Sequence, residues 1–296
     1  MKKPGVISLM CVLAAIAMFI WGFNLQPPEP VVTENRYVLL IDNDTGAFLM
    51  QLRKGLQEAA SSQGARVSVQ NLSANVSVQA AEFSASGVTA VILLLVHPEP
   101  MLLALSEAGV PVVVVGQALN GQVCVMGDDG TAGLVLMDRA LSMAVPSRVL
   151  VIADVEDSRS GARMESIQNH LSHDQLQTLF WNEDVSIPAD VDVLVSLSRR
   201  STRALADARA SGLIPGNYTI LGVDTGDNRA LDLEGGLVSA LVVDNPYAMG
   251  YIALEKARLL ADGDLPPFLY VCEMPLIDRQ NMYLIENVKL VFPLLQ

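Results

Sequence analysis

The fold is decided by Tyr37–Asp42, YVLLID, and by the segment that follows it, residues 46–63, GAFLMQLRKGLQEAASSQ. The first piece is apolar at successive positions, which is typical of a strand buried on both faces of a parallel sheet. In the second piece apolar side chains recur at helical spacing from Leu49 to Ala60, and Gly64 ends the run. A buried strand followed by an amphipathic helix is the repeating unit of a parallel α/β sheet.

The same alternation continues along the chain. Further apolar runs lie at 66–70, 90–95, 110–115, 122–126, 148–153, 178–181, 192–197, 218–223, 238–243 and 268–277. Helical patterns separate most of them, and the longest, over 246–262, opens at Asn245-Pro246. The chain is therefore expected to be an α/β protein. No linker divides its halves, so we expect the chain to pass between them more than once. The pattern assigns no place to residues 282–296.

Composition excludes several classes of protein. The chain has 296 residues, of which 51% are hydrophobic and 17% charged, so it is long enough and apolar enough for a large buried core. Its 19 basic and 32 acidic residues give a net charge of −13, which opposes binding to nucleic-acid phosphates. The 3 cysteines exclude a disulfide scaffold or a multi-cysteine zinc site.

The N-terminus is predicted to be a membrane anchor over residues 1–25. Lys2 and Lys3 precede an uncharged apolar run from Val6 to Phe23, which is at the short end of what spans a bilayer as a helix. No A-x-A cleavage site follows it, although a cleaved signal peptide is the alternative. The lysines place the N-terminus in the cytoplasm, so the body is expected to be extracytoplasmic. The Pro-rich residues 26–35 form a stiff spacer.

Polar side chains gather where the expected strands end. In open α/β sheets ligands bind beyond the carboxyl ends of the strands, so these residues indicate a cleft for a polar ligand. For any one of them, simple capping of the next helix is the alternative. The candidate ligand-binding residues are Asn43, Phe48, Gln117, Arg159, Arg163, Ser198, Asp224 and Asp244.

Signatures of catalysis are missing from the sequence. It contains no G-x-S-x-G elbow, no phosphate-binding loop and no G-x-G-x-x-G after the first strand. The carboxylate pair Asp128-Asp129 has no His nearby, so we expect helix caps, no metal site and no cofactor. Cys124 and Cys272 lie in apolar strands and are expected to be core residues, with a disulfide between them as the minor alternative. The sequence thus favours a protein that is not an enzyme.

Taken in order, these segments resemble the type I periplasmic binding proteins of the ribose and galactose sort, whose fold is shared by the ligand domains of LacI-type repressors. The resemblance covers about residues 36–281 and is carried by IDNDTGAFLMQLRKGLQEAASSQGARV, AGVPVVVVGQ, MGDDGTAGLVLMDRAL, DVLVSLSRRSTRALADARASG, ILGVDTGDNRALDLEGG and LIDRQN. It implies two Rossmann-like lobes joined by three crossover strands near 127, 245 and 277. The lobes would be 36–127 with 246–276, and 128–245 with 277–296.

The resemblance also implies roles for three candidates. Phe48 would stack on a sugar face, Arg163 would donate a forked hydrogen bond to hydroxyls or a ring oxygen, and Asp224 would accept from hydroxyls. Other positions depart from the family pattern, because Leu49, Gly116-Gln117, Ser198 and Asp244 replace an aromatic, an Asp-Arg pair, an Asn and a Gln. A different sugar, a polyol or another polar metabolite is therefore expected, with Arg159 and Asp244 as the hypothetical source of new specificity.

Two functions follow from this resemblance. The first is a solute-binding protein that delivers a sugar-like ligand to the permease of an ABC importer. The second is a membrane-tethered sensor that presents bound ligand to a receptor such as a histidine kinase. Both work by closure of the cleft around the ligand. A repressor is opposed by the acidic charge and by the apolar segment where a DNA-binding domain would lie.

Overall fold

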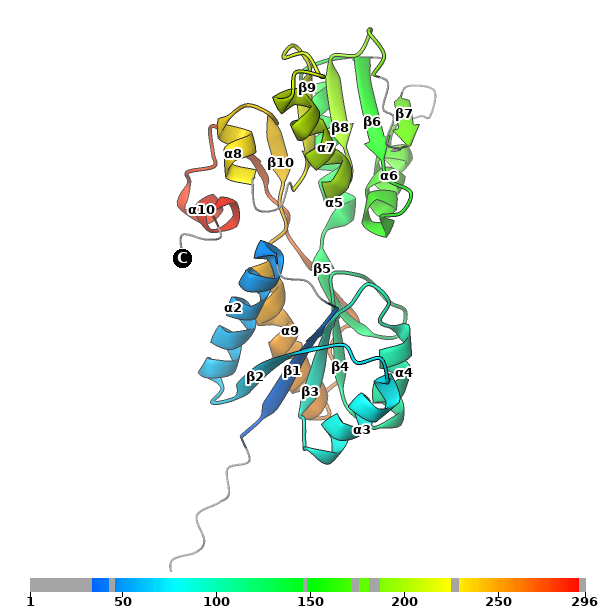
Figure 1. Ribbon diagram of the computed structural model, residues 1–296, viewed down its shortest axis with the longest axis vertical. Coiled ribbons are helices and arrows are strands. Elements are labelled where there is room, and N and C mark those ends of the chain that lie inside the picture. The colour runs from blue at the N-terminus through cyan, green and yellow to red at the C-terminus, as the bar shows by residue number, and fades with distance from the viewer. Residues whose placement is uncertain are drawn as a thin grey trace, which may run out of the picture. The chain divides into compact units, whose positions relative to one another are not determined.

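The computed structural model describes residues 34–42, 46–145, 148–171, 176–180, 187–224 and 229–292 (Figure 1). The chain divides into two units, Met1–Glu34 and Asn35–Gln296, and the second unit holds every helix and strand described below. In the described part of the chain, no helix has the length and apolar character needed to cross a bilayer. The anchor expected over residues 1–25 and most of the spacer at 26–35 lie outside the described residues.

One sheet has six parallel strands in the order β11-β5-β4-β3-β1-β2. These strands are β1 (Arg36–Ile41), β2 (Arg66–Asn71), β3 (Ala90–Leu94), β4 (Val112–Val115), β5 (Val123–Gly127) and β11 (Leu269–Cys272). One face is covered by α2 (Ala47–Ser62) and α9 (Pro246–Ala261), and the other by α3 (Val76–Ala85) and α4 (Glu99–Glu107). The strand YVLLID is buried on both faces because helices pack on both. We call this sheet with its helices the first lobe.

A second sheet has the order β12-β10-β9-β8-β6-β7. Its strands are β6 (Val149–Ala153), β7 (Gln177–Phe180), β8 (Val193–Ser196), β9 (Thr219–Val223), β10 (Ala240–Val242) and β12 (Leu276–Asp278). Only β12 runs antiparallel, against β10. One face is covered by α5 (Asp129–Leu141) and α6 (Ser158–His170), and the other by α7 (Arg199–Ala210), α8 (Arg229–Glu234) and α10 (Ile285–Val291). We call this sheet with its helices the second lobe.

Three segments of the chain pass between the two sheets. They lie between β5 and α5, between β10 and α9, and between β11 and β12. The expected α/β architecture with two lobes is confirmed.

The single strand expected over 268–277 is wrong, because the structure has two strands there. The first, β11, pairs with β5, and the second, β12, pairs with β10. Pro275 interrupts the apolar run where the pairing changes, since proline cannot donate to a ladder. The third crossing therefore precedes residue 277.

Two glycines let α2 and α9 approach closely on the first sheet. A Cβ atom at Gly55 would lie 2.0 Å from the carbonyl oxygen of Tyr247, and one at Gly250 would lie 2.2 Å from that of Leu52. The backbones therefore touch where a side chain would otherwise stand. This contact fixes α2, whose first turn carries Phe48, against the lobe.

Candidate functional site

Two neighbouring cavities open at the carboxyl ends of the strands. The interlobe cavity, of about 460 Å³, is lined by both lobes, and the second-lobe cavity, of about 650 Å³, is lined by the second lobe alone. They share Glu156, Asp157, Arg159 and Arg199. This is the position that open α/β sheets use for ligands.

The first lobe contributes an aromatic ring and a few polar groups to the interlobe cavity. Phe48, in the first turn of α2, packs against the core of the lobe and lines the cavity. Gln117 follows β4, and its Nε2 donates to the carbonyl oxygen of Leu95 at 2.7 Å. Asp42 follows β1, and its carboxylate accepts from the backbone N–H of Val96 at 2.9 Å. These contacts hold Asp42 and Gln117 in the cavity wall.

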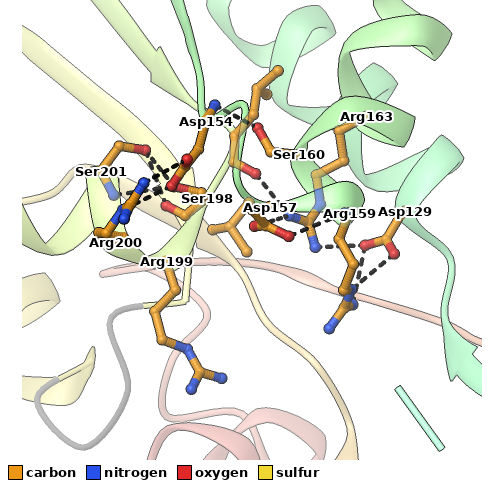
Figure 2. Close-up of polar contacts among 12 residues, drawn as sticks. Asp129, Asp154, Asp157, Arg159, Ser160, Arg163, Ser198, Arg199, Arg200 and Ser201 are labelled. Carbon is orange, nitrogen blue, oxygen red and sulfur yellow. Dashed lines mark hydrogen bonds and ion pairs between the residues drawn. The ribbon is translucent and has the colours of Figure 1, made fainter. Parts of the chain in front are cut away.

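Arg159, in the first turn of α6, is bound by two buried carboxylates. Its Nε and Nη2 donate to the two oxygens of Asp129 at 2.8 and 3.0 Å, as Figure 2 shows. Its Nη1 and Nη2 donate to the two oxygens of Asp244 at 2.9 and 2.7 Å. Both pairs have the forked geometry that makes arginine–carboxylate contacts strong.

The charges of this cluster hold one another in the ionised state. Burial raises the pKa of Asp244, but the charge and hydrogen bonds of Arg159, together with Arg163 and Arg199, outweigh it and leave the pKa below the ordinary value. Burial lowers the pKa of Arg159, but Asp244 and Asp129 outweigh it and leave the pKa above its usual range. Both groups are therefore charged at neutral pH.

Arg163 lies one turn further along α6 and is only 2% exposed. It donates to Asp129 at 2.5 Å, as Figure 2 shows. It also donates to the carbonyl oxygen of Leu197 at 2.7 Å. Burial lowers its pKa and Arg159 adds to that, while Asp129 opposes both. Arginine stays protonated in proteins despite such shifts. A Cβ at Gly133 would lie 2.5 Å from the carbonyl oxygen of Arg163, so α5 and α6 pack closely here.

Ser198 is the N-cap of α7, as the capping alternative predicted. Its hydroxyl accepts from the backbone N–H of Ser201 at 3.1 Å and donates to Asp154 at 3.3 Å. Arg200 donates to both oxygens of Asp154, at 3.0 and 2.7 Å, and also pairs with Glu156 at 2.7 Å. Figure 2 shows this cluster beside the first turn of α7. Ser198 thus sits at the centre of a polar network in the second-lobe cavity.

Asp224 follows β9 and is 1% exposed. Its Oδ2 accepts from Arg229 at 2.8 Å and from Arg199 at 3.2 Å. The Arg199 side chain is 48% exposed, and in Figure 2 its guanidinium points away from the group around Ser198. Sequence reasoning left Arg199 out of the candidate set, although it lies next to Ser198 at the end of the same strand.

The structure brings most of the candidate residues to these two cavities. Phe48 and Gln117 line the interlobe cavity, and Arg159 lines both. The other four described candidates line the second-lobe cavity, namely Arg163, Ser198, Asp224 and Asp244. Asn43 lies outside the described residues.

The described residues contain no cluster of His, Cys, Asp and Glu side chains suited to a metal ion. Cys124 and Cys272 are buried and both are free, so the disulfide held open as an alternative is wrong. Their strands are neighbours, but Cys272 is in register with Gly127 and Cys124 with Leu269. The two thiols therefore belong to different rungs of the ladder.

No family model matches the chain, and no curated protein matches it. Many solved structures do. A glucose-galactose binding protein from Geobacillus stearothermophilus, GanP, matches with a TM-score of 0.69 at 17% identity, over 85% of this chain and 99% of its own. The arabinose-binding protein AraP of the same organism matches with a TM-score of 0.71 at 16% identity, over 84% of this chain and 98% of its own. A putative LacI transcriptional regulator from Bacteroides fragilis matches with a TM-score of 0.68 at 12% identity, over 84% of this chain and 99% of its own.

These similarities define the fold of the chain. It is the two-lobed type I periplasmic-binding-protein fold, which the sugar-binding proteins and the LacI-type regulator share. The expected resemblance is thus confirmed at the level of the fold. A fold of this kind carries more than one function, so the role of the chain has to be argued from its site.

Proposed function

We propose that the chain is an extracytoplasmic binding protein, not an enzyme, that captures a small, polar, sugar-like ligand in the interlobe cavity. The observation that carries this proposal is the composition of that cavity, where the Phe48 ring comes from one lobe and hydrogen-bonding side chains come from the other. An apolar ring face with convergent polar groups suits a sugar, which has both kinds of surface. The names of the glucose-galactose and arabinose binding proteins give further support.

Each described candidate residue has a place in this proposal. Phe48 stacks on the ligand, with Gln117 beside it, and Arg159 donates from the opposite wall. Asp224 accepts from ligand hydroxyls, and Arg199, whose exposed guanidinium lines both cavities, donates to the ligand. Arg163, Ser198 and Asp244 line the second-lobe cavity and orient their charged and polar neighbours around the ligand.

Capture follows from closure of the first and second lobes about the three crossing segments. A ligand that contacts both walls stabilises the closed arrangement by its differential affinity for it. We propose that the closed protein docks on the permease of an ABC importer. The alternative is a sensor held to the membrane by residues 1–25, in which the closed form engages a receptor such as a histidine kinase. It is favoured by their apolar run, which no A-x-A cleavage site follows.

A thermal-shift panel on the full chain tests the proposal. It covers pentoses, hexoses, polyols, furanosyl compounds and amino acids. A ligand at 100 times its dissociation constant stabilises the native state by about 2.7 kcal/mol, which raises the melting temperature by several degrees. We expect one sugar or polyol class to give this shift. No shift with any compound, for a chain that melts cooperatively, would overturn the proposal.

A pair of matched variants places the ligand. Phe48→Ala removes the ring that lines the interlobe cavity and should abolish the shift. Phe180→Ala removes a ring that is 60% exposed on β7 and should leave the shift intact. If the ligand raises the melting temperature of both variants as much as that of the parent chain, the ligand binds outside the interlobe cavity.

A further inference from the structure

The three segments that cross between the lobes converge on one guanidinium. Asp129 is the first residue of α5, directly after the first crossing, Asp244 lies in the second, and Met274 lies in the third. Arg159 binds both carboxylates in forked pairs, and its Nη2 lies 3.7 Å from the sulfur of Met274. One side chain of α6 therefore contacts all three crossing segments or the residues next to them.

Gly127, the last residue of β5, is packed against the same group. A Cβ atom at this position would lie 2.6 Å from Asp244 Oδ1, 2.7 Å from Met274 Sδ and 2.8 Å from Arg159 Nη2. The first crossing thus begins directly beside the guanidinium, and a larger residue at 127 would displace these three side-chain ends. We call Arg159, Asp129 and Asp244 the guanidinium clamp.

Backbone hydrogen bonds also link the crossing segments to one another. The N–H of Asp128 donates to the carbonyl of Cys272 at 2.9 Å, and the N–H of Val243 donates to that of Pro275 at 3.1 Å. The first bond joins the first crossing to the end of β11, where the third crossing begins, and the second bond joins the second and third crossings. Asp128 and Val243 are the sequence neighbours of Asp129 and Asp244, so hydrogen exchange at their amides reports whether the clamp is intact.

We propose that Arg159 is a positioning residue that ties the three crossing segments into one hinge, so that they bend together when the lobes close. Lobe movement in such proteins requires backbone rotation in the few residues that cross. The guanidinium is planar and its N–H groups have fixed directions, so rotation of one bound segment displaces the others.

Arg159 also lines the interlobe cavity, so a ligand there lies against the side chain that holds the hinge. The inference deepens the proposed function and relies on it for this last step. Its test needs no ligand, and the two can therefore fail separately.

Hydrogen–deuterium exchange of the full chain without ligand tests the clamp. Arg159→Met alone leaves Asp244 buried without its partner and risks misfolding, so the double variant Arg159→Gln with Asp244→Asn is used. It removes both charges and leaves Asp129 paired with Arg163. We expect exchange at the amides of Asp128 and Val243 to accelerate at least tenfold, while amides of β3 and β8 keep their rates.

Gly127→Ala provides a second variant that keeps every charge. The added Cβ wedges the clamp apart, so exchange at Asp128 and Val243 should again accelerate together. Arg200→Gln is the matched control, because Arg200 lines the second-lobe cavity and pairs with Asp154 and Glu156, away from the crossings. It should leave both amides unchanged.

Two results would overturn the proposal. One is unchanged exchange at Asp128 and Val243 in the double variant and in Gly127→Ala. The other is an equal rise at all amides of both lobes, which would mean that Arg159 stabilises the fold in general and does not hold the hinge. Absence of any ligand-induced shift in the parent chain, with the accelerated exchange present in both variants, would count against the proposed function alone.

Discussion

Phe48 and Arg199 line one cavity although they come from different lobes, the first from α2 and the second from α7. The cavity has a volume of about 460 Å³, within the range of small-molecule sites. A ligand that touches both residues bridges the lobes. Its affinity should therefore depend on side chains that are remote in sequence and on the segments that let the lobes move.

Replacement of Arg199 should weaken ligand binding and spare the fold. Its side chain is half-exposed, and Asp224 keeps its pair with Arg229 when Arg199 is removed. We expect Arg199→Gln to raise the dissociation constant at least tenfold with a change in unfolding free energy within about 1 kcal/mol, as for an exposed ion pair. Arg258→Gln, which breaks an exposed pair with Asp262, should change neither quantity. Calorimetric titration and chemical denaturation measure the two effects, and unaltered affinity would remove Arg199 from the site.

The ion pair of Asp244 should contribute stability that disappears in acid. Burial raises the pKa of this carboxyl, but Arg159 and its cationic neighbours hold the folded-state pKa below the ordinary value of 3.8. A depressed folded pKa means that the stabilisation is present above the unfolded pKa and is lost as pH falls through the folded one. Melting temperatures from pH 7 to pH 3 should therefore fall less steeply below about pH 4 in Asp244→Asn than in the parent chain. Parallel curves would contradict this assignment.

The close approach of α2 and α9 should make Gly250 intolerant of a methyl group. A Cβ there would lie 2.2 Å from the carbonyl oxygen of Leu52, so Gly250→Ala should destabilise the chain by about 3 kcal/mol. Gly161→Ala is the control, because this glycine lies in α6 with nothing within 4 Å of its added Cβ. That substitution should stabilise by roughly 0.5–1 kcal/mol, since alanine favours a helix. Denaturant titrations of both variants should give shifts of opposite sign.

The sequence predicts the repeating parts of this fold well. Strands such as Tyr37–Asp42 and helices such as 246–262 carry their own periodicity, and the structure has an element at each. The split of 268–277 was missed because apolarity does not record the pairing partner, and its two parts pair with β5 and β10. The end of the chain lacks a pattern, yet Leu290 and Val291 of α10 are buried in the second lobe.

The site was predicted less completely than the fold. Phe48, Gln117 and Arg159 were predicted because each comes shortly after an expected strand, and local sequence alone shows that position. All three line the interlobe cavity. The pairing of Arg159 with Asp129 and Asp244 spans 30 and 85 residues, and no local pattern encodes such distances. For the same reason the pairing of Arg163 with Asp129 was not predicted, and sequence reasoning treated Asp129 as a helix cap.

The most direct test of capture in the interlobe cavity is a calorimetric titration of the full chain with the sugars and polyols of the thermal-shift panel. Phe48→Ala and Phe180→Ala are titrated beside it. We predict one site per chain for one class of compound, an affinity at least tenfold weaker in Phe48→Ala, and no change in Phe180→Ala. Absence of heat with every compound, or equal affinity in the parent and Phe48→Ala, would contradict the proposed capture.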